Sequence, residues 1–304
     1  MQITFNTSLK LNNIRKPDIR NSYPNLSPLK HDTVTFGGNK IGVIKEMNET
    51  NYLEKQVIKI KSDLKEAIEK NDASRIFEYF GIDVEADKSG LLTISEYRQP
   101  LSDITYSDVG IDENKLFEKI KTIQEDADFT NSQVIDLGKL ESIGGDAYFS
   151  NSQVRNLGNL KSIGRDAYLD SSQIIDLGNL QSIGEDVFFH DSQVRNLGKL
   201  ESIGGEAYFS NSQVRNLGNL KSIGRNVYFA YSQIIDLGNL KSIGGDAYFG
   251  ASQIRNLGKL ESIGGDADFV YSQITNLGNL KTVGGQVDYN TQAMEKLLEK
   301  RGLI

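Results

Sequence analysis

The most regular feature of the chain is a 20-residue pattern of apolar and polar positions that runs from residue 126 to residue 285. Eight copies follow one another without an insertion, and the second reads DAYFSNSQVRNLGNLKSIGR. Its apolar positions are Ala147, Phe149, Val154, Leu157, Leu160 and Ile163. Such a repeat predicts a solenoid in which each coil buries its apolar side chains against its neighbours. Residues at the same position in successive copies are called a column below.

The spacing within one copy predicts the path of a coil. Ala147 and Phe149 lie two residues apart, as on one face of a strand, whereas the later apolar positions are too irregular for a strand or a long helix. We expect one short strand and then a tight, turning return path. The invariant glycine columns that begin at Gly138 and Gly144 predict corners with positive φ. The constant Ser and Gln columns, which begin at Ser132 and Gln133, are interpreted as structural, with hydrogen bonds from coil to coil.

The rest of the chain divides around this repeat. Residues 1–40 hold three of the four prolines, and six basic against two acidic residues, which favours a disordered tail. Residues 41–125 form a predicted N-terminal segment that caps the solenoid. It contains helices over 52–79 with a break at 71–72, a hairpin over 81–97 with its turn at 87–90, and a helix over 113–123. The solenoid, with a partial ninth copy, covers 126–289, and residues 290–304 predict a capping helix.

The pattern AxFxxSxV followed by LxxLxxI resembles the leucine-rich repeat in its short, 20-residue bacterial form. The resemblance covers about residues 120–290 and implies an α/β repeat solenoid with a parallel β stack. Two departures concern the first strand position, which is Ala in place of Leu, and the Ser column, which stands where that family has Asn. A right-handed parallel β-helix is the alternative fold. The order of a tail, a helical segment and short repeats is also similar to the layout of some bacterial secreted effectors.

The outward side of the predicted strand is the candidate site. If Ala147 and Phe149 point inward, the residues between and beside them point to solvent. One outward column holds six consecutive aromatic residues: Tyr148, Tyr168, Phe188, Tyr208, Tyr228 and Tyr248. The neighbouring column is mostly acidic and includes Asp146, Asp166, Asp186 and Asp246. A variable pair of columns on the other flank adds Tyr231 and Tyr271.

Two interpretations of this face compete. Aromatic side chains at strand spacing stack on one another and stabilise the sheet by ~0.5–1.5 kcal/mol per pair, so the column predicts a self-stacking ladder in a structural spacer. A ladder alone does not account for the acids beside it. An exposed aromatic strip with an acidic rim is typical of a binding surface. We therefore expect a non-catalytic scaffold that binds a protein or a peptide, with a basic partner favoured by the acids and a glycan as the alternative ligand.

Three other patterns of polar residues stand out in the sequence. Residues 85–96 resemble an EF-hand calcium loop through Glu85, Asp87, Ser89, Thr93 and Glu96, but Glu replaces the first Asp and the flanks alternate like strands, so a plain hairpin is the competing interpretation. Asp170, His190 and Ser210 share an outward column, but an open repeat face lacks the oxyanion hole and pocket of a triad. The arginine column that begins at Arg155 alternates with Ile and is interpreted as a solvated flank.

Composition limits the classes of function. The chain has 304 residues and a net charge of −7, which argues against nucleic-acid binding through a basic surface. It contains no cysteine and two histidines, which argues against zinc sites and thiol chemistry. We expect no enzyme activity and no cofactor. The sequence also shows no membrane span and no signal peptide, so a cytoplasmic location and export by a non-classical route both stay open.

Overall fold

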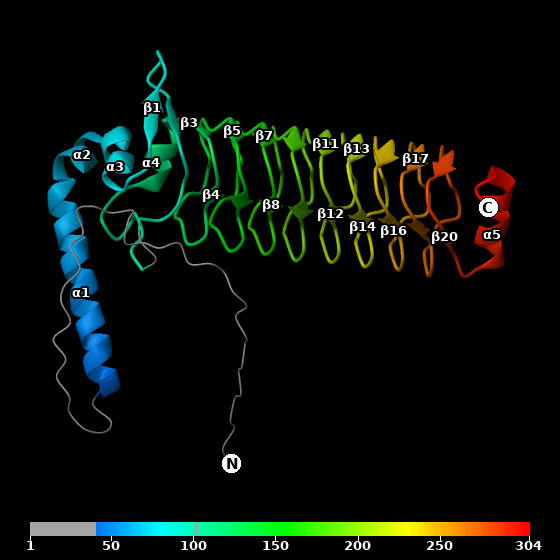
Figure 1. Ribbon diagram of the computed structural model, residues 1–304, viewed down its shortest axis with the longest axis horizontal. Coiled ribbons are helices and arrows are strands. Elements are labelled where there is room, and N and C mark those ends of the chain that lie inside the picture. Colours follow the sequence, from blue (N-terminus) through cyan, green and yellow to red (C-terminus); the bar gives the residue numbers. More distant parts are fainter. Residues whose placement is uncertain (1–40, 101–102) are drawn as a thin grey trace.

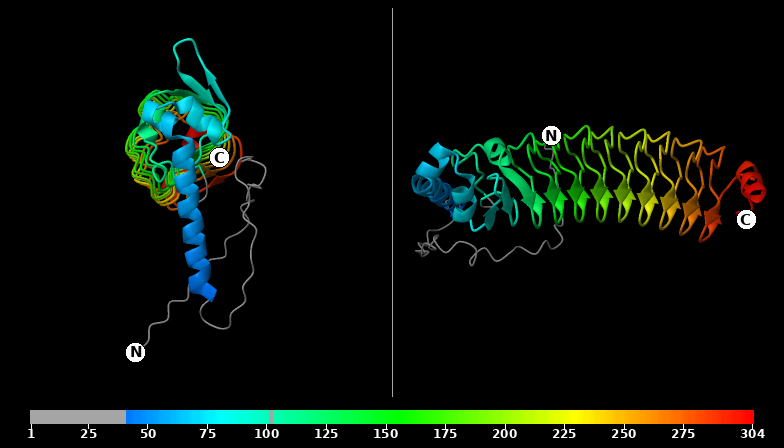
Figure 2. Two further views of the ribbon diagram at one scale, coloured as in Figure 1. Left: turned by 90° about the vertical axis from the view of Figure 1, so that its left-hand side faces the viewer. Right: turned by 90° about the horizontal axis from the view of Figure 1, so that it is seen from above.

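The computed structural model describes residues 41–100 and 103–304, and in it the chain is a parallel β-solenoid with a few helices. The coils stack along the long axis, with helices α1 to α4 at one end and α5 at the other (Figure 1). Viewed along this axis, the coils nearly superimpose (Figure 2). The predicted tail over 1–40 lies outside the described residues.

Four helices and a hairpin precede the coils. The helices are α1 (Ile41–Asp63), α2 (Lys65–Lys70), α3 (Ala73–Tyr79) and α4 (Glu113–Phe117). The predicted break is confirmed, because Asn71 adopts a left-handed conformation after α2 and the Asp72 side chain caps α3. The predicted hairpin is also confirmed, with β1 (Val84–Ala86) antiparallel to β2 (Leu92–Ile94).

Every coil contributes one two-residue strand to each of two sheets, and the strands of successive coils pair in parallel. One sheet contains β4 (Ala127–Asp128), β6 (Ala147–Tyr148), β8 (Ala167–Tyr168), β10 (Val187–Phe188), β12 (Ala207–Tyr208), β14 (Val227–Tyr228), β16 (Ala247–Tyr248), β18 (Ala267–Asp268) and β20 (Val287–Asp288). The other contains β1, β2, β3 (Ile120–Ile123), β5 (Ser142–Ile143), β7 (Ser162–Ile163), β9 (Ser182–Ile183), β11 (Ser202–Ile203), β13 (Ser222–Ile223), β15 (Ser242–Ile243), β17 (Ser262–Ile263) and β19 (Thr282–Val283). The eight copies are called coils 1 to 8 below.

Two details of this path differ from the sequence prediction. The return path carries a second strand in each coil, where only turns are expected. The predicted helix over 113–123 is wrong beyond Phe117, because residues 120–123 form β3 and pair in parallel with both β2 and β5. Sheet pairing prevails here over helical propensity. The segment Thr122–Ile123 resembles Ser142–Ile143 at the same place in coil 1, which is a signal of a partial coil before residue 126.

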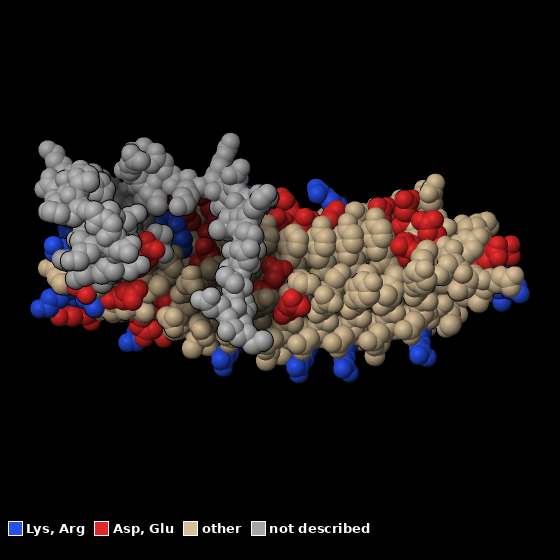
Figure 3. Space-filling view, turned by 90° about the horizontal axis from the view of Figure 1, so that it is seen from below, with Lys and Arg blue, Asp and Glu red and all other residues tan. Residues whose placement is uncertain are grey.

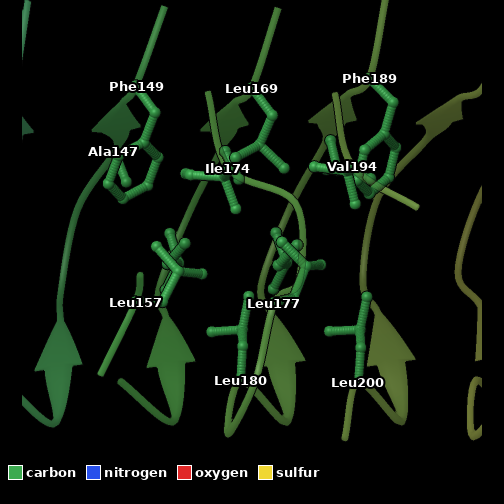
Figure 4. Packing of buried hydrophobic residues seen from close by; sticks show 14 of the residues in the cluster. Ala147, Phe149, Leu157, Leu169, Ile174, Leu177, Leu180, Phe189, Val194 and Leu200 are labelled. Carbon is green, nitrogen blue, oxygen red and sulfur yellow. The ribbon is translucent and has the colours of Figure 1, made fainter. Parts of the chain in front are cut away.

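The predicted apolar columns form one continuous core. Ala147, Phe149, Leu160 and their equivalents are almost fully buried. Figure 4 shows the strand positions Phe149, Leu169 and Phe189 in one row, with Ile174 and Val194 beside them. Burial of a large aliphatic or aromatic side chain contributes ~1.5–3 kcal/mol, and each coil depends on its neighbours for that burial.

The two glycine columns have different roles. The Gly138 column has a φ between +52° and +58°, as predicted for a corner. The Gly144 column is not in the left-handed region, so that part of the prediction is wrong. Its glycines are required by close approach, because a Cβ at Gly184 would lie 2.0 Å from the carbonyl oxygen of Gly164 in the preceding coil.

The serine column does not form the predicted coil-to-coil hydrogen bonds. The Oγ atoms from Ser152 to Ser272 are buried and have no hydrogen-bond partner among the described residues. The backbone N–H of each of these serines instead donates within its own turn, as from Ser192 to the carbonyl oxygen of Phe189 at 3.2 Å. The column is therefore structural through its backbone and its small size.

Polar and aromatic contacts join the terminal elements to the coils. The buried Glu113 accepts hydrogen bonds from the Tyr97 hydroxyl at 2.6 Å and from the Gln133 backbone N–H at 2.6 Å. Burial raises the pKa of Tyr97 well above its usual value, and the Glu113 charge raises it further. At the other end, α5 (Gln292–Arg301) buries Met294 and Leu298.

Candidate functional site: the aromatic ladder and its flanks

The aromatic column forms a continuous stack on the outer face of the β4–β20 sheet. Each strand of the aromatic column, from β6 to β16, buries its first side chain and leaves the second half-buried, as for Ala147 and Tyr148. Parallel pairing in register places Tyr148 beside Tyr168, and so on to Tyr248. The six rings are called the aromatic ladder below. Successive ring centroids lie 4.7–5.0 Å apart and the rings are within 8° of parallel.

The aspartates of the acidic column accept hydrogen bonds from the backbone of the next coil, whereas Glu206 accepts one from the Asn226 side chain. Oδ1 of Asp146 accepts the N–H of Asp166 at 3.1 Å, and Oδ1 of Asp166 accepts the N–H of Asp186 at 2.8 Å. Asn226 replaces the acid in coil 6 and its Oδ1 accepts the N–H of Asp246 at 2.8 Å in the same way. The side chain is needed here for an oxygen atom that accepts this hydrogen bond, and both Asp and Asn supply one.

The second carboxylate oxygen binds the tyrosine hydroxyl of the same coil. The hydroxyl groups of Tyr148 and Tyr168 donate to Oδ2 of Asp146 and Asp166, each at 3.2 Å, and Tyr208 donates to Glu206. Partial burial, followed by the charge of Asp166 and this hydrogen bond, raises the pKa of Tyr168 to about 12. The same causes raise the pKa of Tyr148, whereas in Tyr208 the hydrogen bond to Glu206 is the largest cause.

These contacts change the interpretation of the predicted site. Ring faces inside the ladder are covered by the neighbouring rings, so a ligand can reach only their edges. The carboxylates that the sequence analysis assigns to a binding rim are already engaged with the backbone and the tyrosines, and Asp146 also lies 3.6 Å from Arg165. The structure thus supplies the reason for acids beside the ladder that sequence reasoning missed.

Tyr231 and Tyr271 lie outside the ladder and differ from its residues in exposure and in backbone conformation. They lie in the column that follows the β4–β20 strands, and their side chains are 72% and 77% exposed. Both residues are left-handed, with φ of 58° and 57°. Coils 1, 2 and 5 have Asn at this position, which is the residue that best tolerates such a backbone. Bulky side chains at positive φ are rare, and they are found at functional sites.

The ladder ends where aspartates replace the tyrosines. Asp128 precedes Tyr148, while Asp268 and Asp288 follow Tyr248 in register. Oδ1 of Asp268 accepts the backbone N–H of Val270 at 2.8 Å. Among the described residues, Asp266, Asp268 and Asp288 take part in no ion pair. The end of the ladder next to Tyr271 is therefore acidic.

The weaker candidates are also placed by the structure. Glu85 and Thr93 face each other across the hairpin, and Oδ1 of Asp87 accepts hydrogen bonds from Ser89 and Leu91 within the turn. In the described part of the chain no group of three or more His, Asp or Glu side chains could hold a metal ion. The antiparallel strand pairing is the observation that supports the plain hairpin over the calcium loop, which also includes Glu96.

The column of Asp170, His190 and Ser210 shows no relay of the kind that a triad needs. Asp170 accepts a hydrogen bond from Ser150 Oγ at 3.2 Å. Nε2 of His190 lies 3.0 Å from a carboxylate oxygen of Asp191, its neighbour in sequence. The two groups are thus engaged elsewhere, which agrees with the interpretation of this column as a variable surface.

One further column holds exposed apolar side chains that the sequence analysis treated as a solvated flank. Ile135, Ile175 and Ile235 are 52%, 52% and 55% exposed. Together with Tyr231 and Tyr271 they are the exposed large hydrophobic side chains of coils 1 to 8. Residues 131, 133 and 135 are exposed and alternate with buried residues, and Arg155 of the Ile/Arg column donates to Oε1 of Gln173 in the Gln column at 3.2 Å.

No helix among residues 41–100 and 103–304 is long and apolar enough to cross a membrane. Comparison of the chain with known protein families, curated proteins and solved structures gives no match.

Proposed function

We propose that the chain is a non-catalytic scaffold that binds a protein or a peptide on the side where the aromatic ladder meets Tyr231 and Tyr271. The observation that carries this proposal is the pair of tyrosines, which are about three-quarters exposed and held on a left-handed backbone. A left-handed backbone costs a residue with a Cβ ~1–2 kcal/mol. The coil itself gains nothing in return, because Asn and Ala251 occupy the same position in other coils. Contact with a partner is the gain that fits.

The surroundings of the two tyrosines indicate the class of partner. They are two coils apart, which places them about 10 Å from each other along the stack, and the small residues Gly250 and Ala251 lie between them. Asp268 and Asp288 adjoin this surface without an ion pair among the described residues. Aromatic rings and carboxylates without an ion pair together favour a side chain with an alkyl stem and a positive charge. We therefore propose a Lys- or Arg-bearing peptide, as the sequence analysis does.

A structural spacer is the second candidate, and the ladder itself favours it. Its stacked rings and its tyrosine–carboxylate–backbone hydrogen bonds satisfy one another without a ligand. Glycan binding through the ladder is less favoured, because a sugar stacks on a ring face and the inner faces are covered. Tyr231 and Tyr271 keep free faces, so a glycan stays the alternative ligand there.

The finer class of the solenoid belongs to the same proposal. The 20-residue coil and its inward Ala, Phe and Leu columns support the resemblance to leucine-rich repeats. The second strand in each coil, with parallel pairing on two sides, supports the parallel β-helix alternative more strongly. The terminal contacts of Glu113 and of Leu298 support a role for the helical ends as caps.

The tyrosine pair allows a test that leaves the fold intact. Tyr231→Asn with Tyr271→Asn restores the residue that other coils have, so the double variant should be at least as stable as the wild type. Ala251→Asn is the matched control, since it changes the same column without removing a ring. Both chains and the wild type would be tested on a peptide array that includes basic, acidic and neutral sequences, and on a glycan array.

We expect basic peptides to bind the wild type and the control, and to be lost from the double variant while its thermal midpoint equals or exceeds that of the wild type. Binding should also weaken as salt screens the carboxylates. Equal binding by all three chains would exclude the tyrosine pair as the site. Binding to neither array would favour the spacer.

A further inference from the structure

A ridge of alternating isoleucine and arginine runs along the stack, and it is independent of the site proposed above. It is formed by the residue at one position of coils 1 to 7 and is called the Ile/Arg ridge: Ile135, Arg155, Ile175, Arg195, Arg215, Ile235 and Arg255. All seven residues are exposed. On the side shown in Figure 3, basic side chains project at intervals along one long edge of the stack.

The fold does not require isoleucine on this ridge. The same position holds Arg in four coils and Thr275 in coil 8, with the same coil-to-coil backbone hydrogen bonds, such as Arg155 N–H to the carbonyl oxygen of Ile135 at 2.8 Å and Thr275 N–H to that of Arg255 at 2.9 Å. Isoleucines that are more than half exposed therefore stabilise neither the coil nor the core. Single exposed apolar side chains are common on protein surfaces, so the isoleucines indicate a partner only together with the charges beside them.

The next residue of each coil completes a charge pattern. Coils with Ile on the ridge have an acid after it, namely Asp136, Asp176 or Asp236, and coils with Arg have Asn. Coils 1 to 7 thus carry the charges −, +, −, +, +, − and + along the stack. None of the four ridge arginines forms an ion pair within the described residues, although Arg155 and Arg195 donate to Gln173 and Gln213 at 3.2 and 3.0 Å.

Reversed end to end, this pattern is its own complement at every coil except coil 4, where Arg195 faces Arg195 of the second copy. When a second copy lies antiparallel with coil 4 opposite coil 4, the acid of coil 1 faces Arg255, that of coil 3 faces Arg215, and that of coil 6 faces Arg155. Each contact occurs twice by symmetry, so six of the seven coil positions bring opposite charges together. Each isoleucine then faces an arginine, whose alkyl stem can cover it.

The spacing of the ridge also selects a second copy. Its residues repeat once per coil, and successive coils lie 4.7–5.0 Å apart at the ladder. A helix repeats one face at about 5.4 Å and a strand at about 6.8 Å, so neither stays in register over seven coils. A second stack of the same coils has the same repeat by construction. From the charge pattern, the exposed isoleucines and the shared repeat, we infer that the chain forms an antiparallel two-fold dimer through the Ile/Arg ridge.

The dimer makes this arrangement testable by charge removal and mixing. Asp136→Asn, Asp176→Asn and Asp236→Asn together remove the acids, and Asn156 shows that Asn keeps the turn, since its Oδ1 accepts the Gly158 N–H at 2.7 Å. A second triple variant carries Arg155→Gln, Arg215→Gln and Arg255→Gln. Arg225→Gln, on an exposed arginine outside the ridge, is the control. Mass would be measured by sedimentation velocity on the full chain at low and high salt.

We expect the wild type and the control to sediment as dimers at low salt and to dissociate as salt rises. Each triple variant should be monomeric alone, because only one sign of charge is left to face its own copy. An equimolar mixture of the two variants should form dimers again, since three of the six opposite-charge contacts return. A wild type that is monomeric at every concentration overturns the inference, and so do dimers that both variants keep or monomers that mixing does not rescue.

Discussion

The acidic column should behave as a row of backbone acceptors, and Asp186 offers the cleanest test. Its Oδ1 accepts the backbone N–H of Glu206 at 2.7 Å. Its own coil carries Phe188, which has no hydroxyl group to donate, so the backbone contact stands alone. Asp186→Ala leaves that N–H without a partner in a half-buried place. An orphaned donor costs about 1–3 kcal/mol, and because solvent reaches part of the site we expect a loss of ~1–2 kcal/mol in the free energy of unfolding.

The matched control is Asp186→Asn, because the chain itself uses Asn226 as the acceptor two coils further on. An amide oxygen at the same place keeps the hydrogen bond, so this variant should lose less than ~0.5 kcal/mol. Urea unfolding followed by circular dichroism would give both values, with equal dependence on urea concentration as the sign that the extent of unfolding has not changed.

Either of two results would refute this reasoning. If Asp186→Asn destabilises the chain as much as Asp186→Ala, the negative charge matters and the acceptor geometry does not. If neither variant changes the free energy of unfolding, the acidic column is not structural, and the interpretation of these residues as a binding rim regains its force.

Gly184→Ala should lower the free energy of unfolding by ~3 kcal/mol, because its Cβ would lie against the Gly164 carbonyl oxygen. Gly178→Ala has open space around its Cβ but a φ of +57°, so it should lower that free energy by only ~1–2 kcal/mol. Urea unfolding would distinguish the two losses. Ser192→Ala should be neutral or stabilise the chain by up to ~1 kcal/mol, since it removes a buried hydroxyl without a partner, and a clear loss in the same assay would contradict this. Because the pKa of Tyr168 is about 12, the folded chain keeps a proton that the unfolded chain loses near pH 10. The free energy of unfolding should therefore fall as the pH rises from ~10 towards 12. In Tyr168→Phe this fall should be smaller, which unfolding curves measured at several pH values would show.

The sequence predictions are confirmed where a single local cause determines the residue type of a column. The inward columns of Ala147 and Phe149 follow from apolar spacing alone, and the structure buries both residues completely. The helix break at Asn71 and the hairpin turn at residues 87–90 follow from local chemistry that acts within a few residues. The stacking of the ladder follows from parallel pairing in register, which a repeat without insertions enforces.

The sequence predictions are wrong where the role of a residue depends on a contact with a neighbouring coil. The sequence predicts a positive φ at Gly184, but glycine is required there because a Cβ would lie against the carbonyl oxygen of Gly164 in the preceding coil. Acids beside the ladder were assigned to a partner, but their first contacts are a backbone N–H of the next coil and a tyrosine hydroxyl. Periodicity shows that a column exists, and only the distance between coils shows what it contacts.

Some columns have residue types that the fold requires and others do not, and this difference determines where binding specificity can lie. Columns that satisfy themselves, such as the ladder and its acids, are tied to the fold and carry little information about a partner. Two columns go against what the coil alone favours: Tyr231 and Tyr271 replace Asn on a left-handed backbone, and Ile135, Ile175 and Ile235 expose apolar surface where Arg also fits. The fold accepts several residue types in each of these columns. Substitutions confined to these two columns should therefore change what the chain binds while its free energy of unfolding stays nearly constant, whereas a change in the ladder alters stability first.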